Sequence, residues 1–339
     1  MSTAAFTIGS TVVYRSALLI ALGAAVFFCL SQAIYTSHGG LKSALPVFFP
    51  PAVILSILFS RFIHWYCHGE QYGGFWKAMT DYSTGSFVII GMFAGMILAA
   101  VLIKKLGYVS NLGRFFDCIA PGTALLTAFI RLSALFDSTC VGKVVVSKAP
   151  LQTLPIAYGI VNSASTVEYR FATFFVEFLL LLVVFVMTCV FFSRYRSEPL
   201  KKGCRNDGNA ALMFAVWYSA VELIMDSTRY DSSFVHFNGF VSIVQMACAL
   251  SILAILVYYS IRSVKANGRS GFHWGVWIEY FITLAAVGVS EYMVQRHGDK
   301  YLICYSVMAV VCYYMADSIY RMYLSLRRSE AAESSEADE

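Results

Sequence analysis

Apolar residues run through this chain in long blocks, and short polar segments separate the blocks. A transmembrane helix needs about 20 apolar residues to cross the hydrocarbon core of a bilayer. Nine blocks approach that length, and the predicted spans are residues 16–35, 45–66, 85–103, 117–136, 171–192, 210–227, 240–261, 274–293 and 301–323. The pattern predicts an all-α fold, a polytopic transmembrane helix bundle of about nine spans.

The composition supports a membrane protein. The chain is 58% hydrophobic and 13% charged, whereas a soluble domain carries about 25% charged residues. Its Lys and Arg residues are scattered between apolar blocks, so nothing indicates a nucleic-acid partner. The nine Cys include no CxxC pair and fall mostly inside apolar blocks, which favours small buried residues over metal or redox ligands. The first block is too long for a signal peptide and is interpreted as a retained span.

Basic residues in the connections predict the orientation. Fifteen Lys and Arg residues fall in the connections and tail on one side, and eight fall on the other. The N-terminus is therefore predicted to lie outside and the C-terminus in the cytoplasm. The longest external connection, residues 137–170, is either a passive connector or a functional loop. The acidic end, residues 329–339, is predicted to be a disordered, solubilising tail.

Two basic residues, Arg61 and Arg131, lie inside apolar blocks near the predicted outer ends of their spans. An Arg at mid-membrane costs at least about 2.5 kcal/mol and keeps its charge, so each needs a carboxylate, carbonyl groups or an anionic ligand. The candidate acids are Asp117, Asp137, Glu177, Glu222 and Asp226. Two interpretations stay open: an ion pair that holds helices together, or a pocket for an anionic lipid headgroup.

A second charged group lies at the outer end of the sixth span. Glu222, Asp226 and Arg229 are spaced i, i+4 and i+7, so a helix would present all three on one face. They could form a simple ion-pair ladder, or Arg229 could join Arg131 in one anionic site.

His64 and His68 are four residues apart near the outer end of the second span. This spacing could hold a metal ion, but no carboxylate completes the set, so no metal site is expected. An interfacial anchor formed with Trp65 and Tyr66 is the favoured interpretation.

Five segments, in this order along the chain, resemble the prolipoprotein diacylglyceryl transferase family. These membrane enzymes move a diacylglyceryl group from phosphatidylglycerol to the lipobox cysteine of prolipoproteins. The segments are FTIGSTVVYRSALL at 6–19, FSRFIHWY at 59–66, GSFVIIGMFAG at 85–95, FFDCIAPGTALLTAFIRLSALFDSTCVGKV at 115–144 and WYSAVELIMDSTRYDSSF at 217–234. Spans eight and nine have no counterpart in the usual seven-span family.

The resemblance implies a domain organisation and a set of partners. Residues 1–262 would form the transferase-like membrane domain, residues 263–326 an appended two-span hairpin, and residues 327–339 the acidic tail. The implied partners are phosphatidylglycerol or a related anionic phospholipid and prolipoprotein substrates. The implied location is the bacterial plasma membrane, and no cofactor is expected.

The resemblance also assigns binding residues. Arg131 stands where the family signature has its Arg, and Gly142 where the signature ends in Gly. The signature Asn residues are replaced by Ala134 and Asp137. With Arg61 and Arg229, these positions are the predicted phospholipid-binding set: Arg131, Arg61, Arg229, Asp137 and Gly142.

Other family positions depart from the pattern. The family histidine, thought to serve as a base, aligns with Ile90 or Val88, and an essential Tyr falls on Ser16. An Arg of the penultimate span falls on Glu222, while Asp226 matches the acid that follows it.

A cysteine thiol has a pKa of about 8.5 and benefits from a nearby base, and a leaving phosphate needs cationic stabilisation. Glu222 and Asp226 are the predicted substitutes for the missing base, with Asp137 or His64 as further candidates. Three functions remain: a divergent transferase, a non-catalytic descendant that binds phospholipid or lipoprotein precursors, and a transporter or channel. The transporter or channel hypothesis predicts internal repeats or paired broken helices, and neither is evident.

Overall fold

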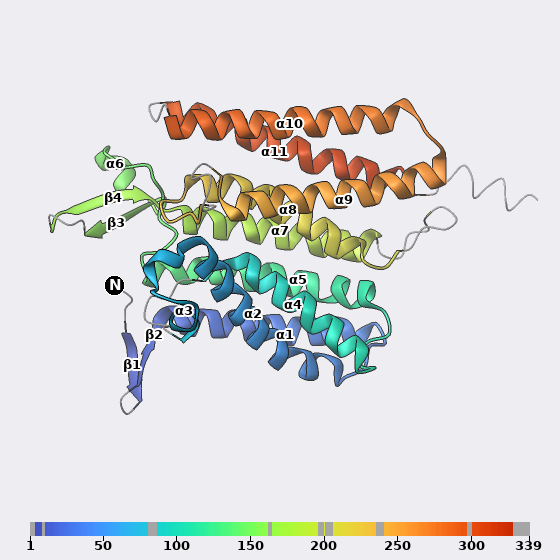
Figure 1. The fold of residues 1–339 in the computed structure, drawn as a ribbon, viewed down its shortest axis with the longest axis horizontal. Coiled ribbons are helices and arrows are strands. Elements are labelled where there is room, and N and C mark those ends of the chain that lie inside the picture. Colours follow the sequence, from blue (N-terminus) through green and yellow to red (C-terminus); the bar gives the residue numbers. More distant parts are fainter. Residues whose placement is uncertain are drawn as a thin grey trace, which may run out of the picture.

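The computed structural model describes residues 4–8, 11–80, 87–161, 165–195, 200, 206–234, 241–296 and 300–327. Within them, long helices run side by side along one common direction (Figure 1). These are α1 (Arg15–Ser37), α2 (Ala44–His68), α4 (Ile89–Lys105), α5 (Leu112–Ser133), α7 (Thr173–Tyr195), α8 (Asn209–Thr228), α9 (Ile243–Asn267), α10 (Gly271–Arg296) and α11 (Tyr301–Leu324).

The long helices correspond one by one to the predicted spans. Eight of them are long and apolar enough to cross a membrane. The remaining one, α4, has 17 residues and ends on Lys104 and Lys105, which is at the short limit for a transmembrane helix. The all-α polytopic bundle is therefore confirmed, and the chain is a multi-pass membrane protein.

The shorter elements gather at one end of the bundle, here called the strand end (Figure 1). They include two antiparallel strand pairs, β1 with β2 and β3 with β4. The elements at this end are β1 (Ala4–Ile8), β2 (Thr11–Tyr14), α3 (Phe75–Thr80), α6 (Ala149–Gln152), β3 (Ala157–Val161) and β4 (Val167–Phe171). The long connection predicted at residues 137–170 is thus largely folded.

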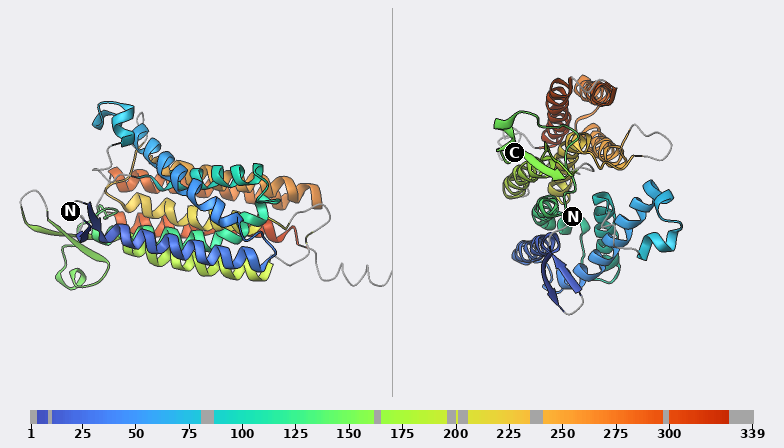
Figure 2. Two further views of the ribbon diagram at one scale, coloured as in Figure 1. Left: turned by 90° about the horizontal axis from the view of Figure 1, so that it is seen from below. Right: turned by 90° about the vertical axis from the view of Figure 1, so that its left-hand side faces the viewer.

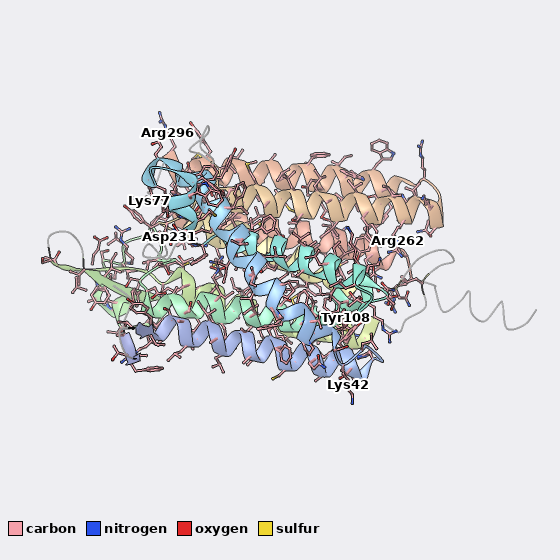
Figure 3. All side chains as sticks on the ribbon, turned by 60° about the horizontal axis from the view of Figure 1, so that its bottom comes forward. Lys42, Lys77, Tyr108, Asp231, Arg262 and Arg296 are labelled. Atoms are coloured by element: carbon pink, nitrogen blue, oxygen red, sulfur yellow. The ribbon has the colours of Figure 1, made fainter. Side chains whose placement is uncertain are left out.

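The strand end corresponds to the side predicted to lie outside. Lys77, Asp231 and Arg296 lie at this end, and Lys42 and Arg262 lie at the opposite end (Figure 3). The orientation itself stays a prediction from the distribution of basic residues. The predicted acidic tail, residues 329–339, lies outside the described residues.

Helix α5 lies centrally, packing against α1 on one side and against α7 and α8 on the other. Helix α11 packs against α8 and α9, and α10 packs against α11. Seen along the bundle, α10 and α11 occupy the flank opposite to α1 and α2 (Figure 2). The last two helices therefore cover one side of the bundle and leave the α1–α2 side uncovered.

Two glycines bring α4 into close contact with α2. A Cβ atom on Gly95 would overlap the backbone of Ser56, and one on Gly91 would overlap the backbone of Ser60. The hydroxyl of Ser56 also donates to the carbonyl of Met92 across the contact at 3.0 Å. Small residues that allow close backbone approach are typical of helix contacts in membranes.

The N-terminus of α8 is capped by a carboxylate from α5. Asp117 is buried and accepts hydrogen bonds from the backbone N–H groups of Gly208 at 2.6 Å and Ala211 at 2.9 Å. These N–H groups have no partner within the helix, and a carboxylate also suits the positive end of the helix dipole. Asp117, one of the acids considered as an Arg partner, thus holds α8 at the end away from the strands.

We expect Gly95→Ala to destabilise the bundle, because the added methyl group would force α2 and α4 apart. Overpacking of this kind lowers the free energy of unfolding by about 1–3 kcal/mol. The matched control is Gly275→Ala in α10, where an added Cβ meets nothing within 4 Å. Thermal unfolding in detergent measures both variants, and equal melting temperatures would contradict the close contact.

Candidate functional site

Arg131, near the C-terminal end of α5, is buried between two carboxylates from other helices. Its Nε donates to Glu177 of α7, and its Nη2 donates to Glu222 of α8. The side chain of Arg131 is 5% exposed, and both glutamates are fully buried. The structure therefore satisfies the buried charge of Arg131 with an ion pair that joins α5, α7 and α8.

Arg229, directly after α8, extends this group of charges toward the strand end. Its Nη1 lies 3.7 Å from both Glu222 Oε1 and Asp226 Oδ1, and its Nε lies 3.3 Å from Asp231 Oδ1. The predicted common face of Glu222, Asp226 and Arg229 is therefore present. The six side chains named here are called the ion cluster: Arg131, Glu177, Glu222, Asp226, Arg229 and Asp231.

The ion cluster holds two guanidinium groups and four carboxylates. Glu222 contacts both guanidinium groups and so links the two halves of the cluster. With every group ionised, the cluster carries an excess of negative charge. The cluster as it stands is thus a network that joins helices, and an anionic ligand would have to compete with its carboxylates for Arg131.

The segment that follows α5 covers the ion cluster. The Cys140 N–H donates to Asp231 Oδ2 at 2.9 Å, the Lys143 N–H to the Thr228 carbonyl at 2.8 Å, and the Tyr230 N–H to the Val141 carbonyl at 2.8 Å. These contacts place a short antiparallel pairing over the end of α8. They leave Asp231 40% exposed at the outer edge of the cluster, while Glu177 and Glu222 beneath it are fully buried.

Two groups in this covering segment have shifted pKa values. Burial alone would raise the pKa of Asp231, but the Arg229 guanidinium and the hydrogen bond from Cys140 outweigh it and hold the pKa below its usual range. Burial raises the pKa of the Cys140 thiol, although Arg229 and Arg131 act in the other direction. Cys140 is therefore a neutral thiol at neutral pH and a poor nucleophile.

Gly142 and Asp137, both predicted for the site, lie in this same segment. A Cβ on Gly142 would come within 2.8 Å of the Phe171 carbonyl oxygen, and Gly142 pairs with Arg229 as an isolated β-bridge. Only a glycine allows the chain to pass this closely beside Phe171. Asp137 follows a 3₁₀ turn at Ala134–Phe136, and among the described residues it forms no ion pair.

An apolar cavity of about 400 Å³ lies between α1, α2, α4 and α5, and Arg131 forms part of its wall. Arg131 is the one charged residue among those that line it. Ile20, Val53, Ile57 and Phe87 also line it and are each at least 40% exposed on the outside of the bundle. The cavity is therefore accessible from the surrounding lipid, on the flank that α10 and α11 do not cover.

Arg61, the other buried Arg, lies beside this cavity but does not line it. Its Nε donates to the carbonyl of Ala78 in α3 at 2.6 Å, and its guanidinium lies 5.1 Å from the ring of Tyr72 and 5.9 Å from that of Phe87. Its neighbour Ser60 and the ring of Phe87 line the cavity. Arg61 thus has a carbonyl and aromatic faces as partners, which was one of the predicted alternatives.

His64 and His68 stack on one another, with ring centroids 4.4 Å apart. The Tyr72 hydroxyl lies 3.1 Å from His64 Nδ1. Within the described parts of the chain, no group of three His, Cys, Asp or Glu side chains is placed to hold a metal ion.

Together these features define a multi-pass membrane protein with a lipid-accessible apolar cavity, one guanidinium in its wall and a buried carboxylate network behind it. The family profile described as prolipoprotein diacylglyceryl transferase matches residues 3–261. The chain therefore belongs to the prolipoprotein diacylglyceryl transferase family. The match ends within α9, and α10 and α11 lie outside it. No curated protein matches the chain.

We expect Arg131→Met to destabilise the protein by about 3–5 kcal/mol, because it leaves the buried Glu177 without a counter-charge and Glu222 with only Arg229, 3.7 Å away. The triple variant Arg131→Met, Glu177→Gln, Glu222→Gln carries no such charge and should recover part of this loss. The control is Arg170→Met, which breaks a partly exposed ion pair with Glu168 and should cost less than about 1 kcal/mol. Unfolding in detergent compares them, and a triple variant less stable than Arg131→Met would contradict the cluster.

The pH dependence of Asp231 provides a further test. Because its folded pKa is depressed, its stabilising contribution is fully present above the unfolded pKa of about 3.9 and is lost as pH falls through the folded value. The difference in melting temperature between wild type and Asp231→Asn should therefore be constant from about pH 5 to 7 and shrink below about pH 4. A difference that grows on acidification would show that the carboxylate is not stabilised by Arg229.

Proposed function

We propose that this chain transfers a diacylglyceryl group from phosphatidylglycerol, or a related anionic phospholipid, to the lipobox cysteine of a prolipoprotein. The observation that carries the proposal is the position of Arg131 in the wall of a lipid-accessible apolar cavity. Such a site suits a molecule with both an apolar chain and an anionic group. The distribution of basic residues supports action at the outer face of a bacterial plasma membrane.

The reaction exchanges one bond for another at a glyceryl carbon. The lipobox thiol gives up its proton, and its sulfur attacks the carbon that bears the phosphate ester oxygen. The sulfur–carbon bond forms as the carbon–oxygen bond breaks, and the electron pair leaves with glycerol phosphate. The residues that serve this step must accept a proton and stabilise the departing negative charge.

The step needs a proton acceptor and a cation that stabilises the leaving phosphate. Glu222 and Arg131 are one such pair, and their side chains are in contact. A carboxylate that accepts the thiol proton becomes neutral and no longer competes for the guanidinium it contacts. Protonation of Glu222 would therefore release part of the Arg131 charge for the phosphate. Asp226, which also faces Arg229, is the second candidate for the base.

The remaining predicted residues take supporting roles in this proposal. Arg229 holds Glu222 and Asp226 in place, and Gly142 and Asp137 belong to the segment that covers the cluster. Arg61 lies beside the cavity, next to the lining residues Ser60 and Phe87, and would help to hold a headgroup that enters there. Residues 1–262 would form the transferase domain, 263–326 an appended hairpin and 327–339 a tail.

One observation favours the alternative, a non-catalytic descendant that only binds phospholipid or a lipoprotein precursor. Val88, one of the two positions aligned with the family histidine, lines the cavity and has no atom that accepts a proton. The cavity and Arg131 would then serve binding without transfer.

The test is a transfer assay with purified protein, phosphatidylglycerol labelled in its acyl chains and a lipobox peptide. We expect transfer by the wild type and a loss of about 100-fold in Arg131→Lys, which keeps a buried positive charge but cannot contact both carboxylates and a phosphate. Glu222→Gln should lower the rate about 10²–10⁴-fold if Glu222 takes the thiol proton. The control is Glu168→Gln, a partly exposed carboxylate on β4.

Two outcomes contradict parts of this proposal. A wild-type protein that transfers nothing, yet binds phosphatidylglycerol in an Arg131-dependent way, is the non-catalytic descendant. If Glu222→Gln keeps the transfer activity and Asp226→Asn loses it, Asp226 and not Glu222 accepts the thiol proton.

A further inference from the structure

A second groove lies on the flank of the bundle that carries the last two helices. It has a volume of about 330 Å³ and is formed by α7, α8 and α11. Four aromatic side chains and one carboxylate line it: Phe191, Trp217, Tyr313, Tyr320 and Asp317. None of its lining residues lines the cavity beside Arg131, so the two sites are separate. The groove depends on α11, which lies outside the family match.

The groove is open toward the lipid. Val190 and Tyr313 on its rim are 52% and 68% exposed, whereas Phe191 is 3% exposed and forms its floor. The ring of Phe191 lies 5.8 Å from that of Trp217 and 6.4 Å from that of Tyr320. The aromatic residues therefore form a continuous lining that a molecule from the bilayer can reach.

A charged group that includes the lining residue Asp317 lies near the C-terminal end of α11. Asp317 accepts from Arg321 Nε at 2.8 Å, and both oxygens of Glu279 accept from Arg321 Nη2 at 2.6 and 2.7 Å. Two carboxylates thus share one guanidinium, so the three side chains carry an excess of one negative charge when ionised. All three are between 27% and 41% exposed, so a ligand can contact them.

These features complement a headgroup that carries both a cation and a phosphate. Aromatic faces and a carboxylate attract an ammonium group, and an exposed guanidinium attracts a phosphate. We propose that this groove binds a zwitterionic phospholipid, with its ammonium group at Asp317 and the aromatic rings, its phosphate at Arg321 and an acyl chain along α7. Phosphatidylglycerol lacks the ammonium group, so the groove distinguishes this lipid from the proposed substrate.

The position along the bundle agrees with a leaflet. Asp317 and Arg321 lie in the last two turns of α11, at the end predicted to be cytoplasmic. Tyr and Trp side chains favour the membrane–water interface, where the polar headgroups begin. The groove is therefore assigned to the inner leaflet, whereas Arg131 lies toward the outer leaflet under the same orientation.

Trp217 provides a reporter for this lipid. In a full-length variant, the tryptophans at positions 65, 76, 274 and 277 are replaced by phenylalanine, so that Trp217 is the single tryptophan. This variant is reconstituted in vesicles that contain equal amounts of phosphatidylethanolamine and phosphatidylglycerol. Two samples are compared: in one only the phosphatidylethanolamine carries brominated acyl chains, and in the other only the phosphatidylglycerol does. Brominated chains quench the fluorescence of a tryptophan that they contact. If the four substitutions impair folding, the difference in quenching between wild type and Trp217→Phe gives the same measurement.

We expect brominated phosphatidylethanolamine to quench Trp217 with a relative binding constant about three times that of brominated phosphatidylglycerol, the size of one exposed cation–aromatic or ion contact. Asp317→Asn should reduce the ratio to about one, and it leaves the Glu279–Arg321 pair in place. The control Tyr314→Ala removes an exposed ring that does not line the groove and should keep the ratio. Equal quenching by the two lipids in wild type, or an unchanged ratio in Asp317→Asn, overturns the proposal.

Discussion

A guanidinium cannot give up its proton inside a membrane, so a buried Arg obliges the fold to bring partners to it. Arg131 lies on the central helix α5, and its two partners come from α7 and α8. Each ion pair therefore fixes the position of a whole helix. The same requirement accounts for the polar face of α8. Glu222 on this face contacts Arg131, and Asp226 on the same face lies next to Arg229, so that the two charges offset each other.

The two sides of Arg131 have opposite character. On one side lies an apolar cavity that is open to lipid, and on the other lie the two fully buried carboxylates of Glu177 and Glu222. A ligand phosphate in the cavity and a carboxylate in the cluster would compete for the same guanidinium. Any lipid anion that binds at Arg131 is for this reason coupled to the protonation of Glu177 or Glu222.

Local patterns account for the parts of this structure that could be predicted from sequence. Hydropathy located all the long helices, and the spacing of Glu222, Asp226 and Arg229 placed them on one face. The choice of Glu177 among five candidate acids could not be made, because it depends on which helices pack together. The contact of Cys140 with Asp231, 91 residues apart, and the cap that Asp117 provides for α8 likewise arise only from tertiary packing.

Two further arrangements were also beyond sequence reasoning. Arg61 finds its carbonyl partner in α3, a short helix that hydropathy does not reveal. The aromatic groove combines α7, α8 and α11, whose lining residues share no motif. In each case the missing information was the lateral order of helices, which is set by packing between distant segments.

The arrangement of the ion cluster also has a consequence for the order in which the protein is made. Arg131 is synthesised 46 residues before Glu177 and 91 residues before Glu222. During synthesis α5 therefore reaches the membrane with an unmatched charge, and it must stay at the insertion site or in a hydrated position until α7 and α8 arrive. Membrane insertion of this protein is thus a concerted event over three helices, α5, α7 and α8, and the last two helices join a core whose charges are already matched.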